Sequence, residues 1–129
     1  MMERFITDEP MEQLQAVANA TELTQAMVLC KQCTVSKDVM RYIAAVCDAA
    51  RKPEKVRIGP SPRAVLALMR CCQALAAVRG RDYVIPDDVK ELAEPVLAHR
   101  IVMRGMGGQA DAVVRQVLET VPVPTEEKV

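Results

Sequence analysis

The sequence predicts an all-α domain, on three observations. Half of the residues are apolar, but the only aromatic residues are two Tyr and one Phe, so the core must be built from aliphatic side chains, Met and Cys. Apolar residues recur at three- and four-residue spacing in several segments, which is the period of a helix with one buried face. Pro, Ser and Gly stand where helices commonly begin and end, and no segment has the pattern of a parallel sheet.

Residues 59–80 (GPSPRAVLALMRCCQALAAVRG) carry the strongest helix signals of the chain. Ser61 can accept a hydrogen bond from a first-turn N–H, and Pro62 suits the first helical position. Gly80 can adopt the left-handed conformation just past the helix end. Between these signals nearly all residues are apolar and many are small. We therefore expect a buried central helix with other helices packed closely on several of its sides.

The segments at the N-terminal end carry weaker signals. Acidic residues ahead of Pro10 predict a helix start, with Leu14 and Val17 as its few apolar contacts. Thr21 can cap a following helix of about a dozen residues. The apolar stripe of that helix is expected to face inward (Leu23, Met27, Cys30 and Cys33).

A clearly amphipathic helix follows from Ser36 to about Arg51, and its ends carry the charges that the helix dipole favours. Its buried face is expected to consist of five regularly spaced residues (Val39, Ile43, Val46, Cys47 and Ala50). A charged loop around Pro53 comes next, and residues 56–58 are expected to be extended before the central helix.

Beyond the central helix, the connector residues Tyr83 and Val84 are expected to pack against the core. Pro86, followed by two Asp, starts the next helix. Pro95 cannot continue that helix without losing a backbone hydrogen bond, at a cost of about 3 kcal/mol, so a break at the preceding Glu94 and a separate short helix to residue 100 are predicted. A last amphipathic helix is expected near the C-terminus, over residues 109–120 (burying Val113, Val114, Val117 and Leu118).

The expected organisation is a flexible segment at residues 1–9, a helical domain over residues 10–121, and a frayed tail at residues 122–129. The chain has 17 basic and 17 acidic residues, which argues against binding to nucleic acid or an anionic membrane. No apolar run approaches the ~18 residues of a membrane span, and the N-terminus lacks the apolar stretch of a secretory signal. These features favour a cytoplasmic protein.

The five cysteines leave an odd one and suggest no disulfide framework. Cys30 and Cys33 form a C-x-x-C pair that can begin a zinc site, but both also lie on the apolar stripe of a predicted helix. Cys71 and Cys72 are adjacent in the central helix and point about 100° apart, which suits a tetrahedral site poorly. We therefore expect no metal, and interpret the cysteines as small apolar core residues.

Arg63 is the residue of the central helix that packing does not explain. It falls in the first turn, where free N–H groups and the helix dipole already make the surroundings positive, so a cation is disfavoured there by about 0.3–1 kcal/mol. With an anion present, the same turn becomes a receptor for phosphate oxygens, which a guanidinium can bind with two hydrogen bonds. The alternative is an arginine that reaches out to water or to a surface carboxylate.

Three blocks in order resemble the C-terminal helical lid of MoxR-family AAA+ ATPases: G-P-S-P-R-A, G-R-D-Y-V-I-P-D-D-V and P-V-L-A-H-R. The resemblance covers residues 35–121. It implies that Arg63 is the second sensor arginine, which reaches from the lid to the γ-phosphate of bound ATP, with Ser61 and Pro62 at the supporting helix N-terminus. Two positions depart from the family pattern, which usually has a small residue and a Thr there (Pro60 and Ile85).

The resemblance also implies what surrounds such a domain. Members of the family form rings, commonly hexamers, in which ATP and Mg²⁺ are bound with an α/β core domain of the same chain. They act in chaperone-like remodelling or maturation of other proteins, often with von Willebrand A-domain partners. The sequence contains no G-x-x-x-x-G-K-[ST] phosphate loop, so this chain alone is expected to hold no cofactor and to be inactive.

Two alternatives from other classes remain open. A long central helix followed by G-R-D-Y-V-I-P-D-D-V is also typical of a histone-fold interaction module, although Pro95 would interrupt a helix that such a fold needs unbroken. A helix-turn-helix DNA-binding domain is the other alternative, which the balanced charge disfavours. Tight dimerisation would indicate the first, and salt-sensitive DNA binding would indicate the second.

Overall fold

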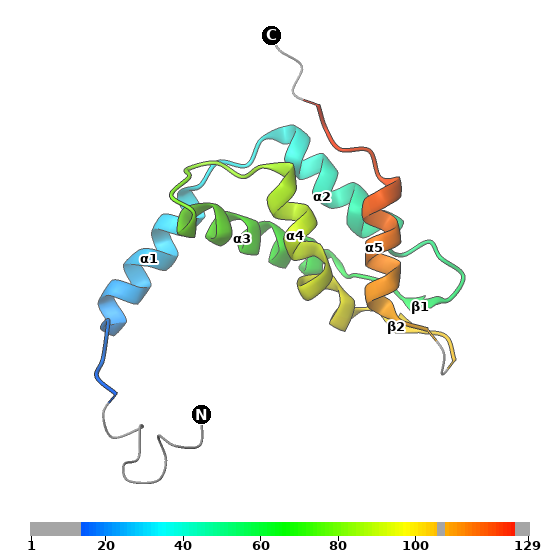
Figure 1. The fold of residues 1–129 in the computed structure, drawn as a ribbon, viewed down its shortest axis with the longest axis horizontal. Helices are drawn as coiled ribbons and strands as arrows, with labels where there is room; N and C mark the ends of the chain where they lie inside the picture. Colours follow the sequence, from blue (N-terminus) through cyan, green and yellow to red (C-terminus); the bar gives the residue numbers. More distant parts are fainter. Residues whose placement is uncertain (1–13, 106–107, 126–129) are drawn as a thin grey trace, which may run out of the picture.

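The computed structural model describes residues 14–105 and 108–125. These residues form five α-helices, one 3₁₀ turn and a two-stranded ribbon: α1 (Ala20–Gln32), α2 (Lys37–Ala49), β1 (Val56–Ile58), α3 (Pro62–Val78), α4 (Pro86–Leu97), η3 (Ala98–Arg100), β2 (Val102–Met103) and α5 (Ala110–Thr120). The all-α prediction is confirmed, with the small ribbon as an addition (Figure 1).

α3 lies at the centre of the fold, where it contacts α1, α2 and α4 (Figure 1). Its buried residues are mostly small (Ala64, Leu68, Cys72, Gln73 and Ala76). Pro62 is the first helical residue and Gly80 has a φ of +72°, as predicted for the start and the end of the helix. The burial is not complete all round, because Leu66 and Val78 are 58% and 84% exposed.

α2 and α5 contribute to the core, together with α3 and α4, through the amphipathic faces that the sequence predicts. Ser36 caps α2, and its Oγ accepts a hydrogen bond from the Val39 N–H at 3.2 Å. The buried faces are apolar (Val39, Tyr42, Ile43, Val46 and Cys47 in α2; Val113, Val114 and Val117 in α5). Leu118 is only partly buried. α2 ends at Ala49, so Arg51 lies beyond the helix and not in its last turn.

α1 differs most from the prediction. Its N-cap is Asn19, not Thr21: the Asn19 side chain accepts from the Glu22 N–H at 2.9 Å, and the Glu22 carboxylate accepts from the Asn19 N–H at 2.8 Å. This is a reciprocal capping box. No residue of α1 is buried, and Leu23 and Met27 of the expected inward stripe are 62% and 56% exposed. The prediction holds at the C-terminal end of the stripe, where Cys30 is half-buried and Cys33 is buried. The N-terminal half of the stripe stays open because α1 packs mainly against one neighbour, α3.

The segment before α1 also departs from the prediction. The expected helix start at Pro10 lies outside the described residues. Leu14 and Val17, its expected apolar contacts, are not helical and are among the most exposed apolar residues. Over residues 14–105 and 108–125, no helix combines the length and the apolar composition that a membrane span needs.

α4 continues through Pro95, so the predicted break at Glu94 is wrong. The proline stands two residues before the end of α4, and its missing N–H removes one bond, to the Glu91 carbonyl. Ala98 again donates to the Glu94 carbonyl, so the helix pattern resumes one turn later. The expected separate short helix is reduced to η3, and the chain then turns into β2 instead of extending the helix as a histone fold requires.

Candidate functional site

The segment that carries Arg63 enters α3 from the β ribbon. The two strands pair antiparallel (Val56 with Met103 and Ile58 with Val102). Just after β2, Arg104 donates twice to the chain before and within β1: its N–H to the Lys55 carbonyl at 2.7 Å and its Nε to the Val56 carbonyl at 3.2 Å. The expected extended segment at residues 56–58 is therefore confirmed, and it gives the approach to α3 a fixed starting point.

Residues 59–61, the approach segment, are held by the chain at the end of α2. Arg51 Nε donates to the Pro60 carbonyl at 2.7 Å, and Pro60 is fully buried. At Gly59 the backbone comes so close to Arg51 that an added Cβ would lie 2.5 Å from its Cγ and 2.8 Å from its Cα. Arg51 also lies 3.4 Å from a carboxylate oxygen of Asp48. Nothing in the sequence indicates these contacts, because the two segments meet only when α2 packs against α3.

Ser61 is the N-cap of α3, but its side chain makes no capping hydrogen bond, so the predicted hydroxyl cap is wrong. The Ser61 carbonyl accepts instead, from the Ala64 N–H at 2.9 Å and from the Val65 N–H at 3.4 Å. The Ala64 amide, one of the two that a capping hydroxyl could reach, is thus already bonded. Pro62 has no N–H to satisfy, and the Arg63 amide donates to no backbone carbonyl among the described residues.

Arg63 follows directly, in the first turn, with an exposed side chain. No residue that the structure describes forms an ion pair or a side-chain hydrogen bond with it, and the first turn of α3 contains no acidic residue. The alternative of a surface carboxylate partner therefore finds no support in these residues. Guanidinium, free amide and helix dipole together can bind an oxyanion such as a phosphate oxygen.

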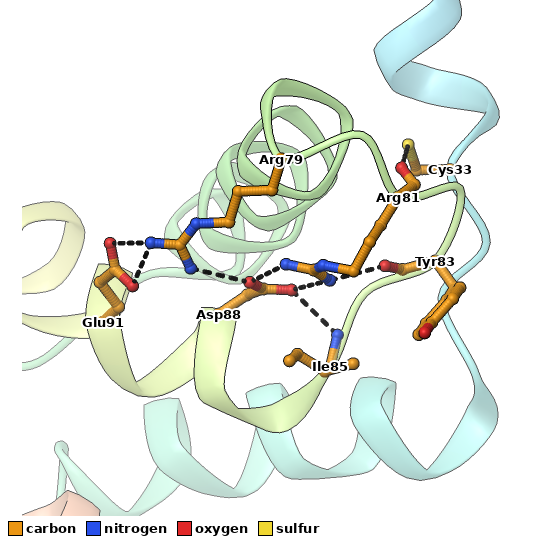
Figure 2. A network of polar contacts seen from close by, with 7 residues as sticks. All are labelled: Cys33, Arg79, Arg81, Tyr83, Ile85, Asp88 and Glu91. Carbon is orange, nitrogen blue, oxygen red and sulfur yellow. Dashed lines mark hydrogen bonds and ion pairs between the residues drawn. The ribbon is translucent and has the colours of Figure 1, made fainter.

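A second polar cluster lies at the other end of α3, about 24 Å along the helix from Arg63. Figure 2 shows its centre, the Asp88 carboxylate, which is fully buried. Arg81 donates to both of its oxygens, at 2.9 and 2.6 Å, and the Ile85 N–H donates at 3.0 Å. Arg79 lies 3.5 Å from the same carboxylate and forms a two-bond pair with Glu91, at 2.9 and 2.8 Å.

This cluster joins the end of α3 to the start of α4. Burial by itself raises the pKa of Asp88, but the hydrogen bonds from Arg81 and the Ile85 amide, with the charges of Arg81 and Arg79, outweigh it and hold the pKa below its usual value. Ile85 has no hydroxyl for a capping box, and its carbonyl accepts from the Asp88 N–H at 3.1 Å instead. Arg81, Arg79 and the Ile85 amide thus hold the Asp88 carboxylate from the end of α3 and the connector, which is a structural role.

Of the two connector residues that were expected to pack against the core, only one does so. Val84 is buried, as predicted, but Tyr83 is 52% exposed. Arg81 lies over the Tyr83 ring, 5.9 Å from its centroid, and donates to the Tyr83 carbonyl at 2.9 Å. The tyrosine therefore shields a guanidinium at the surface instead of filling the core.

The five cysteines differ from Arg63 in their environment. All five are free; three are buried and two are half-buried (Cys33, Cys47 and Cys72; Cys30 and Cys71). Burial raises the pKa of Cys47 to about 11 and that of Cys72 to about 12, so both are thiols at neutral pH. Within the described part of the chain, no three His, Cys, Asp or Glu side chains come together as metal ligands.

Comparison with known proteins identifies the fold. A sequence model of the AAA lid domain family matches residues 48–119, more than half of the chain. The chain belongs to the AAA lid domain family. This lid is 39% identical over 92 residues to the uncharacterized protein YeaC of Bacillus subtilis, a match that covers 68% of the lid chain and 29% of YeaC. It is 42% identical over 97 residues to the chaperone MoxR1 of Mycobacterium tuberculosis, with 64% and 26% covered.

The likeness extends to a solved structure. A crystal structure from Cytophaga hutchinsonii, of a candidate ATPase, superposes with a TM-score of 0.71 at 27% identity and covers 81% of the lid chain and 34% of the other. The protein MoxR of Paracoccus denitrificans is 32% identical over 107 residues. The lid is thus of the MoxR type, and it spans about a third or less of the length of these relatives. Family membership decides against the histone-fold and helix-turn-helix alternatives.

Proposed function

We propose that this lid supplies a second sensor arginine, Arg63, to ATP bound by the core domain of a MoxR-type AAA+ ATPase. One observation supports the proposal above all others: Arg63 is exposed in the first turn of the central helix, without a carboxylate partner among the described residues. A surface arginine gains nothing from such a place unless an anion comes to it. The resemblance of the S-P-R segment to the family motif gives that anion an identity, the γ-phosphate.

The chemistry follows from the geometry of the first turn. The free amide of Arg63 and the dipole of α3 point toward the position of the anion, while the guanidinium can bind two of its oxygens. Charge that develops on the transferring phosphoryl group would be stabilised by these donors, and the transfer to water depends mainly on such positioning and electrostatics. The phosphate loop and the Mg²⁺ ligands belong to the core domain in this proposal. Loss of the γ-phosphate would release Arg63 and let the lid move.

The exposed side of α1 supports a partner domain. Several large apolar residues lie open there (Leu23, Met27, Val28 and Leu29, each more than half exposed). Open apolar surface of this kind usually marks an interaction site. We assign it to the core domain, in a homo-oligomeric ring of six subunits. Chaperone-like remodelling in the cytoplasm, with a von Willebrand A-domain protein as a further partner, completes the proposal. The similarity to the chaperone MoxR1 supports this activity.

The test is the ATPase rate of the complete ring that carries this lid. Arg63→Ala is expected to lower kcat by about ten- to a thousandfold, by analogy with arginines that act on a transferring phosphoryl group. Arg63→Lys is expected to restore little, because an ammonium lacks the planar fork that binds two oxygens at once. Arg70→Ala, an exposed arginine two turns along the same helix whose hydrogen bond goes to Gln73, is the matched control. An Arg63→Ala ring with the turnover of the control would exclude the sensor role.

A further inference from the structure

We infer that Arg51 is a positioning residue for Arg63: it fixes the approach segment, residues 59–61, and thereby the first turn of α3. The inference rests on the proposed role of Arg63, and it concerns how the chain holds that residue in place. Arg51 stands in another part of the chain, just after α2.

The contact is specific to one backbone atom. Arg51 Nε donates to the Pro60 carbonyl at 2.7 Å, and Pro60 is fully buried, so without this donor the carbonyl would face the interior unpaired. A hydrogen bond from a charged donor is stronger than one between neutral groups. The Gly59 backbone lies in close contact with the Arg51 backbone, because a Cβ added at Gly59 would be only 2.8 Å from the Arg51 Cα. Hydrogen bond and steric contact together leave the approach segment little freedom.

The position of Arg63 depends on this segment because the chain between them is short. Pro60 precedes Ser61, and the Ser61 carbonyl receives the Ala64 and Val65 N–H groups that begin α3. A shift of the Pro60 carbonyl therefore moves the whole first turn. Small misplacements of a group that acts on a reacting centre are costly, since about 1 Å can lower a rate by about a hundredfold.

Arg41 provides a matched comparison on α2. Each of the two arginines has a carboxylate three residues before it, Asp38 for Arg41 at 3.2 Å and Asp48 for Arg51 at 3.4 Å. Exposed pairs of this kind contribute little to stability. The two arginines differ in that Arg51 also donates to the approach segment. Any effect of Arg51→Met that exceeds the effect of Arg41→Met therefore reports on the contact with Pro60.

The first experiment uses the 129-residue chain and measures amide hydrogen exchange. Arg51→Met is expected to speed exchange at Ala64 and Val65 by about tenfold, while α5 and the middle of α2 keep their protection. Arg51→Lys is expected to keep most of the protection, because its ammonium can still donate to the same carbonyl. Gly59→Ala, which forces the segment away from Arg51, is expected to reproduce the effect of Arg51→Met. Faster exchange throughout the chain would mean a general structural role and overturn the inference.

The second experiment uses the complete ATPase and separates kcat from KM. Arg51→Met is expected to lower kcat by about tenfold or more with KM for ATP changed less than twofold, and Arg51→Lys to recover most of the loss. If Arg63→Ala lowers kcat and Arg51→Met behaves like Arg41→Met, the positioning role is refuted while the sensor role stands. If Arg63→Ala has normal turnover, the sensor role is refuted and the positioning role with it.

Discussion

Asp88→Asn offers the sharpest test of how the end of α3 is joined to the start of α4. The wild-type carboxylate accepts two hydrogen bonds from Arg81 and one from the Ile85 amide in a fully buried position. An Asn side chain of the same shape has one acceptor oxygen, and its NH₂ group would oppose one of these donors. Breaking a buried ion pair costs about 3–5 kcal/mol, and the 20% exposure of the Arg81 side chain lowers the estimate to about 3 kcal/mol.

The assay is urea denaturation of the 129-residue chain. With a slope of about 1–3 kcal/mol per molar urea, a loss of about 3 kcal/mol moves the midpoint by about 1–3 M. Asp87→Asn is the control, because Asp87 stands next in the same helix turn but its side chain is 77% exposed and pairs only with Lys90 among the described residues. The control is expected to cost less than about 1 kcal/mol. Equal losses for the two variants would refute the reasoning.

The pH dependence gives the same prediction a second measurement. The pKa of Asp88 is lower in the folded chain than the usual value of about 3.9 in the unfolded chain. A carboxyl with a lowered folded pKa contributes stability above its unfolded pKa and loses it as the pH falls through the folded pKa. The difference between wild type and Asp88→Asn is therefore expected to be constant above about pH 5 and to shrink below about pH 4. A difference that persists at pH 2 would assign the loss to packing instead.

Two further predictions concern single side chains of the 129-residue chain. Arg63→Ala is expected to leave the free energy of unfolding unchanged or to raise it by up to about 1 kcal/mol, because it removes a cation from the positive end of a helix. Urea denaturation measures this free energy. A variant that does not fold would mean that Arg63 has a structural role. Tyr42→Phe is expected to raise stability by about 1 kcal/mol, because the Tyr42 hydroxyl is buried with no hydrogen-bond partner among the described residues. Thermal melting checks the second, and a lower melting temperature would mean that the hydroxyl is bonded.

In the candidate site, one important arginine could be predicted from the sequence and another could not. Arg63 stands out from the sequence because its conflict with the helix dipole is local and depends only on its place after Ser61 and Pro62. Arg51, which holds the same turn from α2, gives no such signal: its charge also suits the end of a helix. Its actual partner, the Pro60 carbonyl, is a backbone atom that any residue type would provide. A contact of this kind becomes visible only in the folded chain.

Two buried polar residues make the same point within the core. Gln73 is almost fully buried in α3, and its amide donates to the carbonyls of Lys31 and Cys33 at 3.1 and 2.7 Å, which ties the end of α1 to α3. The sequence predicts Asp88 to be an ordinary acidic residue in a first helical turn, but it is the buried centre of the junction between α3 and α4. Residue type alone predicts exposure for both, because polar groups are buried only where partners satisfy them.

The sequence by itself determined where helices begin and end at Ser36, Pro62 and Gly80, and which faces of α2 and α5 are buried. These signals act within one helical turn, so they need no tertiary contact. The tertiary structure decided that α4 tolerates Pro95 near its end and that the N-terminal half of the apolar stripe of α1, at Leu23 and Met27, stays open. Both outcomes depend on what lies beside a helix, and the free energy of packing against distant segments outweighs local propensity.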